Sequence, residues 1–179
     1  LEAERGYHVM FANPAIKLRK ALVSADRSVS LAHMAEGIRA TGVAAISVAD
    51  DRWAHCNLKV VSLLANILAR QQAVDAGCAE ALLIRDGFLK EGAASNIFIV
   101  KDGVLLAPPK TSFMLPGITY DIVLELAAGH GQPLEIREIH ENELHAADEV
   151  WMTSSTKEVL AITTLDGKPV GSGANAGKP

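Results

Sequence analysis

A lysine set between apolar residues is the first candidate for chemistry in this sequence. Lys59 stands between Leu58 and Val60. An ammonium group held against apolar side chains loses its hydration, so its pKa falls and the neutral amine becomes available as a nucleophile. On these residues alone, a surface lysine in the first turn of a helix, with a buried aliphatic stem, explains the pattern as well.

A carboxylate beside small residues is the second candidate. Glu91 precedes Gly92 and two alanines, just before an apolar strand. Small residues at this point suit the close approach of a flat ligand. The alternative is that Glu91 ends one strand of a hairpin and faces water.

Two further segments carry groups that bind anions. Residues 115–119 (Leu-Pro-Gly-Ile-Thr) lead into an expected helix, where free backbone N–H groups and the Thr119 hydroxyl can bind phosphate or carboxylate. Residues 153–156 (Thr-Ser-Ser-Thr) place four consecutive hydroxyls between two apolar strands. The alternatives are that Thr119 only caps the helix and that the hydroxyl run is a polar turn.

The elements that must position these residues are predicted from apolar periodicity. A helix is expected to begin at the Lys59 segment and to end near Gly77, because an apolar face repeats every three to four residues. We expect this face to be buried; it consists of Val60, Leu63, Leu64, Ile67 and Leu68.

Strands dominate the rest of the chain. The pairs Asp86-Gly87 and Asp102-Gly103 predict tight turns of an antiparallel meander. Strands are expected at residues 43–48, 81–84, 96–100, 104–106, 134–139, 149–153 and 159–164, and helices at 15–25, 30–40, 118–129 and 141–145. This order predicts a single α+β domain over residues 1–179, with a mixed, mostly antiparallel sheet and packed helices.

Composition and the remaining residue types argue against several classes of protein. The chain is 49% hydrophobic and 21% charged with a net charge of −4, so nucleic acid and anionic membranes are not expected partners. No apolar run reaches the about eighteen residues that cross a bilayer and no signal peptide is seen, so we expect a cytoplasmic protein. Cys56 and Cys78 lack CxxC spacing and are expected to be reduced. No metal site is expected, because His140 and His145 are five residues apart, whereas HExxH spacing is four.

Taken together and in order, the four segments resemble the signatures of fold-type IV pyridoxal-phosphate enzymes. The similarity runs from about residue 36 to 179, through residues 59–71, 91–98, 115–119 and 153–158 with 166–169. The last segment, Thr-Ser-Ser-Thr-Lys-Glu-Val, is more similar to the D-amino-acid aminotransferases than to the branched-chain group. The resemblance implies the fold of the larger, cofactor-binding domain, and it implies that the family's N-terminal domain is absent from this chain.

The resemblance also implies roles for individual residues. Lys59 is implied to be the Schiff-base lysine and the base that moves a proton, and Glu91 the carboxylate that faces the pyridine nitrogen. Arg52 is implied to be a buried structural partner near the cofactor. Further cofactor-binding residues implied are Leu115, Gly117, Ile118, Thr119, Ser154 and Ser155, and Thr156 and His8 are implied to contact substrate.

The activity implied is transamination between a D-alanine-like D-amino acid and a 2-oxo acid, with pyridoxal 5′-phosphate as cofactor, in a homodimer. Two other reactions with the same cofactor stay open: aminodeoxychorismate lyase and branched-chain aminotransferase. A third reading is a structural or cofactor-binding module without turnover, because the segments that choose the substrate are absent or divergent.

Overall fold

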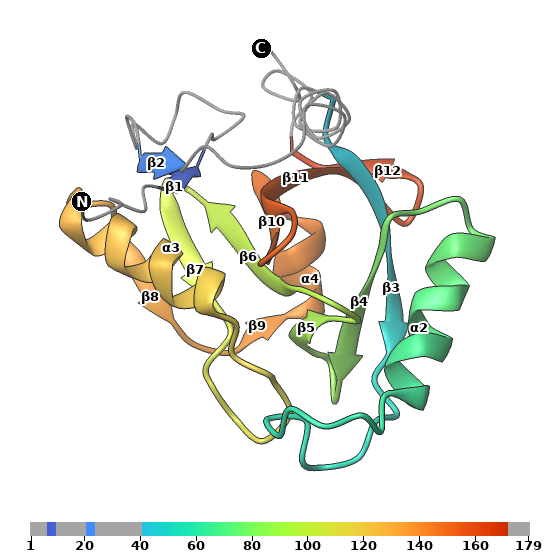
Figure 1. Cartoon of the computed structure of the whole chain (residues 1–179). Coiled ribbons are helices and arrows are strands. Elements are labelled where there is room, and N and C mark those ends of the chain that lie inside the picture. Colours follow the sequence, from blue (N-terminus) through green and yellow to red (C-terminus); the bar gives the residue numbers. More distant parts are fainter. Residues whose placement is uncertain (1–6, 10–20, 24–40, 172–179) are drawn as a thin grey trace.

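The computed structural model describes residues 7–9, 21–23 and 41–171 (Figure 1). The first two segments form strands β1 (Tyr7–Val9) and β2 (Ala21–Val23), which pair antiparallel. The helix expected over residues 15–25 is therefore wrong at Ala21–Val23. The rest of that helix, and the one expected at 30–40, lie outside the described residues. His8 lies on β1, opposite Leu22.

The main sheet has ten strands in the order β8-β7-β6-β10-β11-β3-β4-β5-β9, with β12 paired to β11. Only the pairs β7–β8, β11–β3 and β3–β4 are parallel, which confirms the predicted mixed, mostly antiparallel sheet. The strands are β3 (Val43–Ala49), β4 (Glu80–Arg85), β5 (Phe88–Gly92), β6 (Asn96–Lys101), β7 (Val104–Ala107), β8 (Leu134–Ile136), β9 (Ile139–His140), β10 (Glu149–Ser154), β11 (Glu158–Leu165) and β12 (Lys168–Pro169).

Both predicted Asp-Gly turns are present. Asp86 and Gly87 have φ values of 54° and 80°, and Asp102 and Gly103 have 50° and 80°. Two consecutive residues with positive φ are what a tight hairpin needs, because this turn matches the twist of the strands it joins. The meander β4–β5 and β6–β7 is therefore set locally by the sequence.

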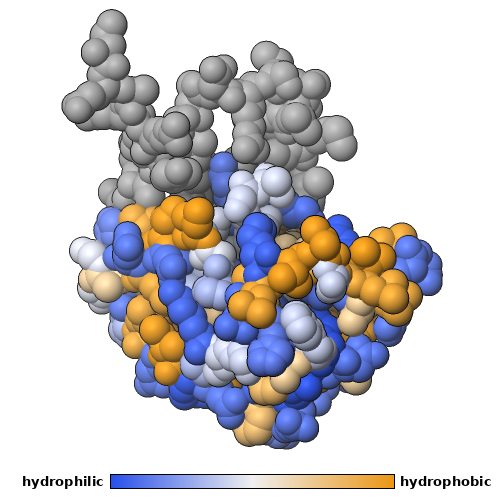
Figure 2. All heavy atoms as spheres, turned by 60° about the horizontal axis from the view of Figure 1, so that its bottom comes forward, coloured by the Kyte–Doolittle hydropathy of each residue, from blue (hydrophilic) through white to orange (hydrophobic). Residues whose placement is uncertain are grey.

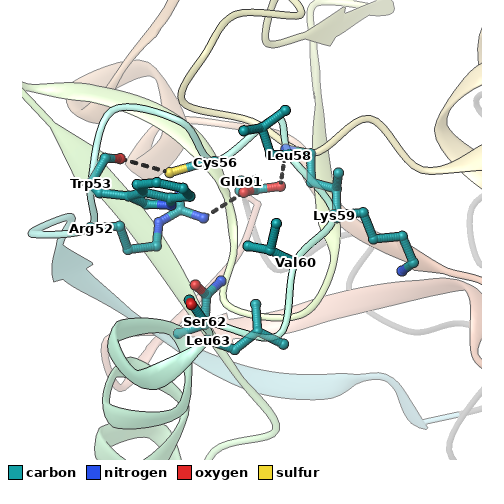
Figure 3. A pocket seen from close by; sticks show the side chains of 11 residues that line it. Arg52, Trp53, Cys56, Leu58, Lys59, Val60, Ser62, Leu63 and Glu91 are labelled. Atoms are coloured by element: carbon teal, nitrogen blue, oxygen red, sulfur yellow. Dashed lines mark hydrogen bonds and ion pairs between the residues drawn. The ribbon is translucent and has the colours of Figure 1, made fainter.

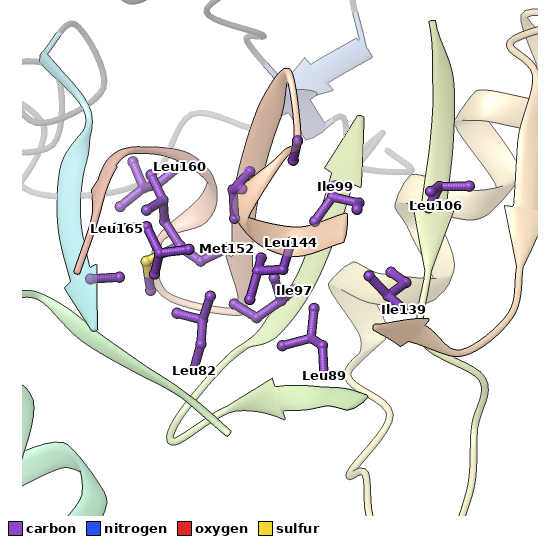
Figure 4. Close-up of a cluster of buried hydrophobic side chains, with 14 residues drawn as sticks. Leu82, Leu89, Ile97, Ile99, Leu106, Ile139, Leu144, Met152, Leu160 and Leu165 are labelled. Carbon is purple, nitrogen blue, oxygen red and sulfur yellow. The ribbon is translucent and has the colours of Figure 1, made fainter. Parts of the chain in front are cut away.

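Alternating side chains divide the core between the two faces of the sheet. On β6, Ile97 and Ile99 point to one face and Phe98 to the other, and β10 repeats the pattern with Met152 and Trp151. The first face packs against α4 (Glu141–His145) through Leu144 (Figure 4). The second packs against α3 (Ile118–Gly129). None of the helices in the described part of the chain is long and apolar enough to cross a membrane.

The helix after Lys59 departs from the prediction in two ways. It is α2 (Leu64–Asp75), so it begins five residues beyond Lys59, and its buried residues are Ala69 and Ala73. The apolar face predicted to be core is instead exposed: Val60 38%, Leu63 45%, Leu64 69%, Ile67 60% and Leu68 56%.

Small side chains explain this orientation of α2. Ala69 and Ala73 pack against Ala81, Leu83 and Ala93, so the helix backbone approaches β4 closely. The larger apolar residues consequently point outward, and Figure 2 shows hydrophobic side chains gathered over α2 and the segment that leads into it.

Candidate active site

A pocket lies where the segment after β3, the end of β5 and the Leu115 loop meet (Figure 3). Three of the predicted site residues line it: Lys59, Glu91 and Leu115. The remaining lining residues are Arg52, Trp53, Cys56, Leu58, Val60, Ser62, Leu63 and Asn66. Its wall thus has apolar side chains at Leu58, Val60 and Leu63 and charged ones at Arg52 and Glu91.

Glu91 is buried and bonded at both carboxylate oxygens. Oε1 accepts a hydrogen bond from Arg52 Nη1 at 2.5 Å, and Oε2 accepts bonds from Leu115 N at 3.1 Å and Asn96 Nδ2 at 3.3 Å. The interpretation of Glu91 as a water-facing strand end is therefore wrong, since the residue is 5% exposed. Burial raises the pKa of Glu91 to about 7, although the Arg52 guanidinium acts in the opposite direction.

Arg52 joins Glu91 to a second buried carboxylate. Its guanidinium donates to Asp50 Oδ1 from Nε at 2.8 Å and to Oδ2 from Nη2 at 3.1 Å, and Arg85 Nε also donates to Oδ2 at 3.2 Å. Burial raises the pKa of Asp50, but the hydrogen bonds from Arg52 and Arg85 outweigh burial and lower it. Two carboxylates and two guanidiniums thus neutralise one another beneath the pocket, as buried charges require.

Asn96 connects Glu91 to the two anion-binding segments. Its side chain donates to Leu115 O at 2.9 Å and accepts from Gly117 N at 3.0 Å, so it holds the residues before α3. Its backbone oxygen accepts from Thr153 Oγ1 at 3.3 Å, where β6 pairs with β10. Segments far apart in the sequence therefore meet beside Glu91.

Lys59 lines the pocket, but its amine is not beside Glu91. The residue is exposed and lies outside any helix or strand, and in Figure 3 its side chain points away from Glu91. Leu58 and Val60 are themselves 50% and 38% exposed, so the expected apolar walls do not enclose the amine.

The other predicted residues do not line the pocket. Gly117 is the N-cap of α3, whose first turn receives no hydrogen bond from a capping side chain, so Thr119 does not cap the helix. Ile118 is 74% exposed, and Ser155 and Thr156 are exposed in the turn between β10 and β11. Ser154 accepts a hydrogen bond from Lys157 N at 3.2 Å. The side chain of His8 lies outside the described residues.

Residues 140–145, which superficially suggested a metal motif, have structural contacts. His140 caps α4, accepting from Asn142 N at 3.1 Å, and His145 Nε2 lies 3.7 Å from Asp166 Oδ2. Within residues 41–171 no cluster of three potential metal-binding side chains is found. Both cysteines are unpaired.

Several site residues were not singled out from the sequence, among them Asn96, which bonds to Glu91. Asp50 and Arg85 complete the ion network, and Asn66 Nδ2 donates to Ala93 O at 3.0 Å beside the pocket. A charged residue directly after each of two apolar strands was the available signal for Asp50 and Arg85. The Asn66 contact depends on the packing of α2, which the apolar pattern predicted wrongly.

The fold is shared with solved class IV aminotransferases. The structure of the Escherichia coli branched-chain amino acid aminotransferase matches with a TM-score of 0.66 and 30% identity, over 78% of this chain and 48% of that chain. A putative branched-chain amino acid aminotransferase from Thermotoga maritima matches with a TM-score of 0.67 and 31% identity, over 74% of this chain and 49% of that one.

Sequence comparison gives the family. The family model for amino-transferase class IV matches residues 20–165, and the chain belongs to this family. The D-alanine aminotransferase of Bacillus licheniformis is 43% identical over 133 residues, which are 74% of this chain and 47% of the relative. That of Listeria innocua is 38% identical over 132 residues, 74% and 46% of the two chains. The chain thus spans about half the length of the curated relatives it matches.

Proposed function

We propose that the protein uses pyridoxal 5′-phosphate to transfer an amino group between a D-amino acid and a 2-oxo acid. The observation that carries the proposal is a buried carboxylate, Glu91, in the wall of a pocket that Lys59 also lines. Relatives named D-alanine aminotransferases, up to 43% identical, support the D-amino acid as donor.

The residues of the pocket fit this cofactor. Each carboxylate oxygen can accept about two hydrogen bonds. Oε2 of Glu91 has two donors, whereas Oε1 has only Arg52 among the described residues, so Oε1 can accept a further N–H from a heterocycle. An anionic acceptor favours the protonated form of a pyridine nitrogen. When bound, the cofactor supplies an electron sink for the charge that develops at the substrate α-carbon.

Lys59 is the residue we assign to covalent attachment and to proton transfer at the substrate α-carbon. Its exposed position on a segment outside α2 leaves its long side chain able to turn toward the pocket that it lines. Leu58, Val60 and Leu63 form an apolar rim there, which would exclude water once a ring filled the pocket.

The phosphate group of the cofactor can find hydrogen-bond donors at the N-terminus of α3. The N-terminus of α3, where Ile118 and Thr119 follow Gly117, offers N–H groups without a side-chain cap. We assign phosphate binding to this helix end with Ser154 and Ser155, and contact with the substrate carboxylate to Thr156 and His8. Leu115 and Gly117 are assigned to the cofactor because Asn96 and Glu91 hold their backbone beside the pocket.

A second copy of the chain is the partner we propose for an exposed apolar face that is formed by α2 and the segment that leads into it. Of the eleven exposed large apolar side chains among the described residues, nine lie between Trp53 and Val74. A monomer usually exposes a patch of about 300–600 Å², and one side of a standard interface covers about 800 Å². An apolar face can pair with its own copy about a two-fold axis without charge complementarity. Because Leu58, Val60 and Leu63 belong both to this face and to the pocket rim, a partner would also cover the pocket.

The proposal is tested by comparing D-alanine and L-leucine as amino donors. The protein with pyridoxal 5′-phosphate, D-alanine and 2-oxoglutarate is expected to form pyruvate and glutamate. Solved neighbours named branched-chain aminotransferases favour a second candidate, for which L-leucine would be the donor. Transfer from L-leucine but not from D-alanine would favour this second reaction, and transfer from neither would contradict the proposed activity.

A further inference from the structure

We propose that Glu80 is a positioning residue of the site, which sets the spacing between the helix that follows Lys59 and the turn that follows Glu91. The inference rests on the proposed function, because the spacing matters to a ligand that must reach both residues. Glu80 itself does not line the pocket.

Glu80 is a fully buried carboxylate whose oxygens are both engaged. It is 0% exposed at the start of β4. Oε1 accepts from Ala81 N at 3.0 Å, and Oε2 accepts from Ser95 Oγ at 2.8 Å. Arg70 Nη1 lies 3.6 Å from Oε2 and supplies the opposite charge. A buried carboxylate is costly, so its bonds are expected to fix the groups around it.

The Ser95 bond holds the turn between β5 and β6. Gly92 N donates to Ser95 O at 2.7 Å and closes this turn, which has Glu91 on one side and Asn96 on the other. A Cβ atom at Gly92 would overlap Ser95 Oγ and would lie 3.2 Å from Glu80 Cγ. The turn is therefore shaped around the Glu80–Ser95 contact.

The Arg70 contact holds the other partner, helix α2. Arg70 and Asn66 are one helical turn apart, so both can face the sheet. Asn66 Nδ2 donates to Ala93 O at 3.0 Å, inside the same turn that Ser95 ends. Glu80 and Ala93 together thus tie α2, and through its first residues the Lys59 segment, to the turn that follows Glu91.

A third element, the turn between β10 and β11, carries a lysine that interacts with the charge of Glu80. Lys157 follows the hydroxyl turn between β10 and β11 and is half-buried. Its pKa is lowered, by burial and then by the charge of Arg70, while Glu80 acts in the opposite direction. Removal of the carboxylate would leave two neighbouring cations without this counter-charge.

Two ligands separate positioning from general stabilisation. Pyridoxal 5′-phosphate has to reach Lys59 and Glu91 at once, whereas pyridoxamine 5′-phosphate forms no covalent bond with a lysine. The variants are Glu80→Gln, which keeps an acceptor for Ser95 but loses the charge, and Glu80→Ala. The matched control is Glu143→Gln, because Glu143 also pairs with an arginine, Arg137, at 2.7 Å but lies in α4.

Dissociation constants of both ligands would be measured for each variant of the full chain. Glu80→Gln is expected to weaken pyridoxal 5′-phosphate about tenfold, the effect of losing one charge-assisted contact, and to change pyridoxamine 5′-phosphate less than twofold. Equal weakening of both ligands, or no weakening of either, would overturn the inference. Absence of pyridoxal 5′-phosphate binding by the unsubstituted chain would instead overturn the proposed function.

Hydrogen exchange without cofactor gives a second readout. The amides of residues 92–96 should exchange faster in Glu80→Gln than in the unsubstituted chain, while amides of β6 and β10 stay protected. Glu80→Ala should show the same pattern more strongly if it folds. Unchanged exchange in residues 92–96 of Glu80→Gln would show that Glu80 does not hold the turn and would overturn the inference.

Discussion

Arg52 donates a hydrogen bond from Nη1 to Oε1 of Glu91 over 2.5 Å, although 39 residues separate the two in the chain. The same guanidinium bonds to Asp50 through Nε and Nη2. It also donates to Phe113 O at 3.0 Å, so one side chain joins the ends of β3 and β5 to the loop before α3. The carboxylate that we assign to the cofactor is therefore held by the fold itself.

Arg52→Ala is expected to destabilise the protein by about 3–5 kcal/mol, because it leaves Glu91 buried without a counter-charge and Asp50 with Arg85 as its remaining cationic partner. Arg52→Lys should recover only part of this loss, since a single ammonium cannot reproduce the planar fork that bonds to both carboxylates. Urea unfolding followed by circular dichroism measures both values. A cost below about 1 kcal/mol for Arg52→Ala would contradict the structural role of the network.

The stability of the protein should depend on pH through Glu91. Its folded pKa of about 7 lies above the ordinary value of 4.5, so between these values the folded protein holds a proton that the unfolded chain has lost. The stability gained from this proton is complete below pH 4.5 and is lost as the pH rises through 7. Asp50 acts in a separate window, below its ordinary pKa of 3.8, because its pKa is lowered.

The comparison of the unsubstituted chain with Glu91→Gln isolates this effect. The unfolding free energy of the unsubstituted chain, minus that of the variant, should fall by up to about 3 kcal/mol from pH 4.5 to pH 7. A difference that stays constant, or that rises with pH, would show that Glu91 is ionised in the folded protein throughout the range.

Glu91→Gln should also lower the rate of transamination about a hundredfold or more, because a neutral amide cannot keep a pyridine nitrogen protonated. Glu138→Gln is the control, since Glu138 is half-exposed and pairs with Lys90 at 2.8 Å. Steady-state kinetics with saturating cofactor measure the effect. Equal rates for Glu91→Gln and the control would show that Glu91 takes no part in the reaction.

The exposed face of α2 should control self-association. Leu64→Gln, Ile67→Gln and Leu68→Gln combined are expected to shift the protein from dimer to monomer in sedimentation velocity, with little loss of thermal stability, because these side chains are exposed in one chain. Ile136→Gln is the control, as Ile136 is 53% exposed outside this face. If the triple variant and the control sediment alike, the second copy does not bind here.

Most strands and both Asp-Gly turns could be predicted because their signals are local, whereas β5 and β12 were not predicted and the single strand expected at 134–139 is divided between β8 and β9. The short apolar runs of β6 and β10 and the Asp-Gly pairs at residues 86–87 and 102–103 each indicate the local structure of a short segment. The orientation of α2 could not be predicted in this way. Its sequence carries both a stripe of large apolar residues and the pair Ala69 and Ala73, and only packing against β4 decides which face is buried.

The roles of the site residues could not be predicted from local signals either. Glu91 and Lys59 had plausible surface interpretations on their own residues, and only the resemblance singled them out. Burial of Glu91 depends on Arg52, Asn96 and Leu115, which reach it from three other parts of the chain. Periodicity carries no information about such distant partners. The position of the Lys59 side chain depends likewise on the later start of α2.

The central claim is that Lys59 and the Glu91 pocket hold pyridoxal 5′-phosphate. The most direct test is to incubate the chain with the cofactor, reduce it with borohydride and locate the label by peptide mass spectrometry, beside Lys59→Ala and the control Lys110→Ala. We predict one cofactor per chain, attached at Lys59, with labelling lost in Lys59→Ala and kept in Lys110→Ala. Labelling of Lys59→Ala equal to that of the unsubstituted chain, or a label spread over surface lysines, would contradict the account.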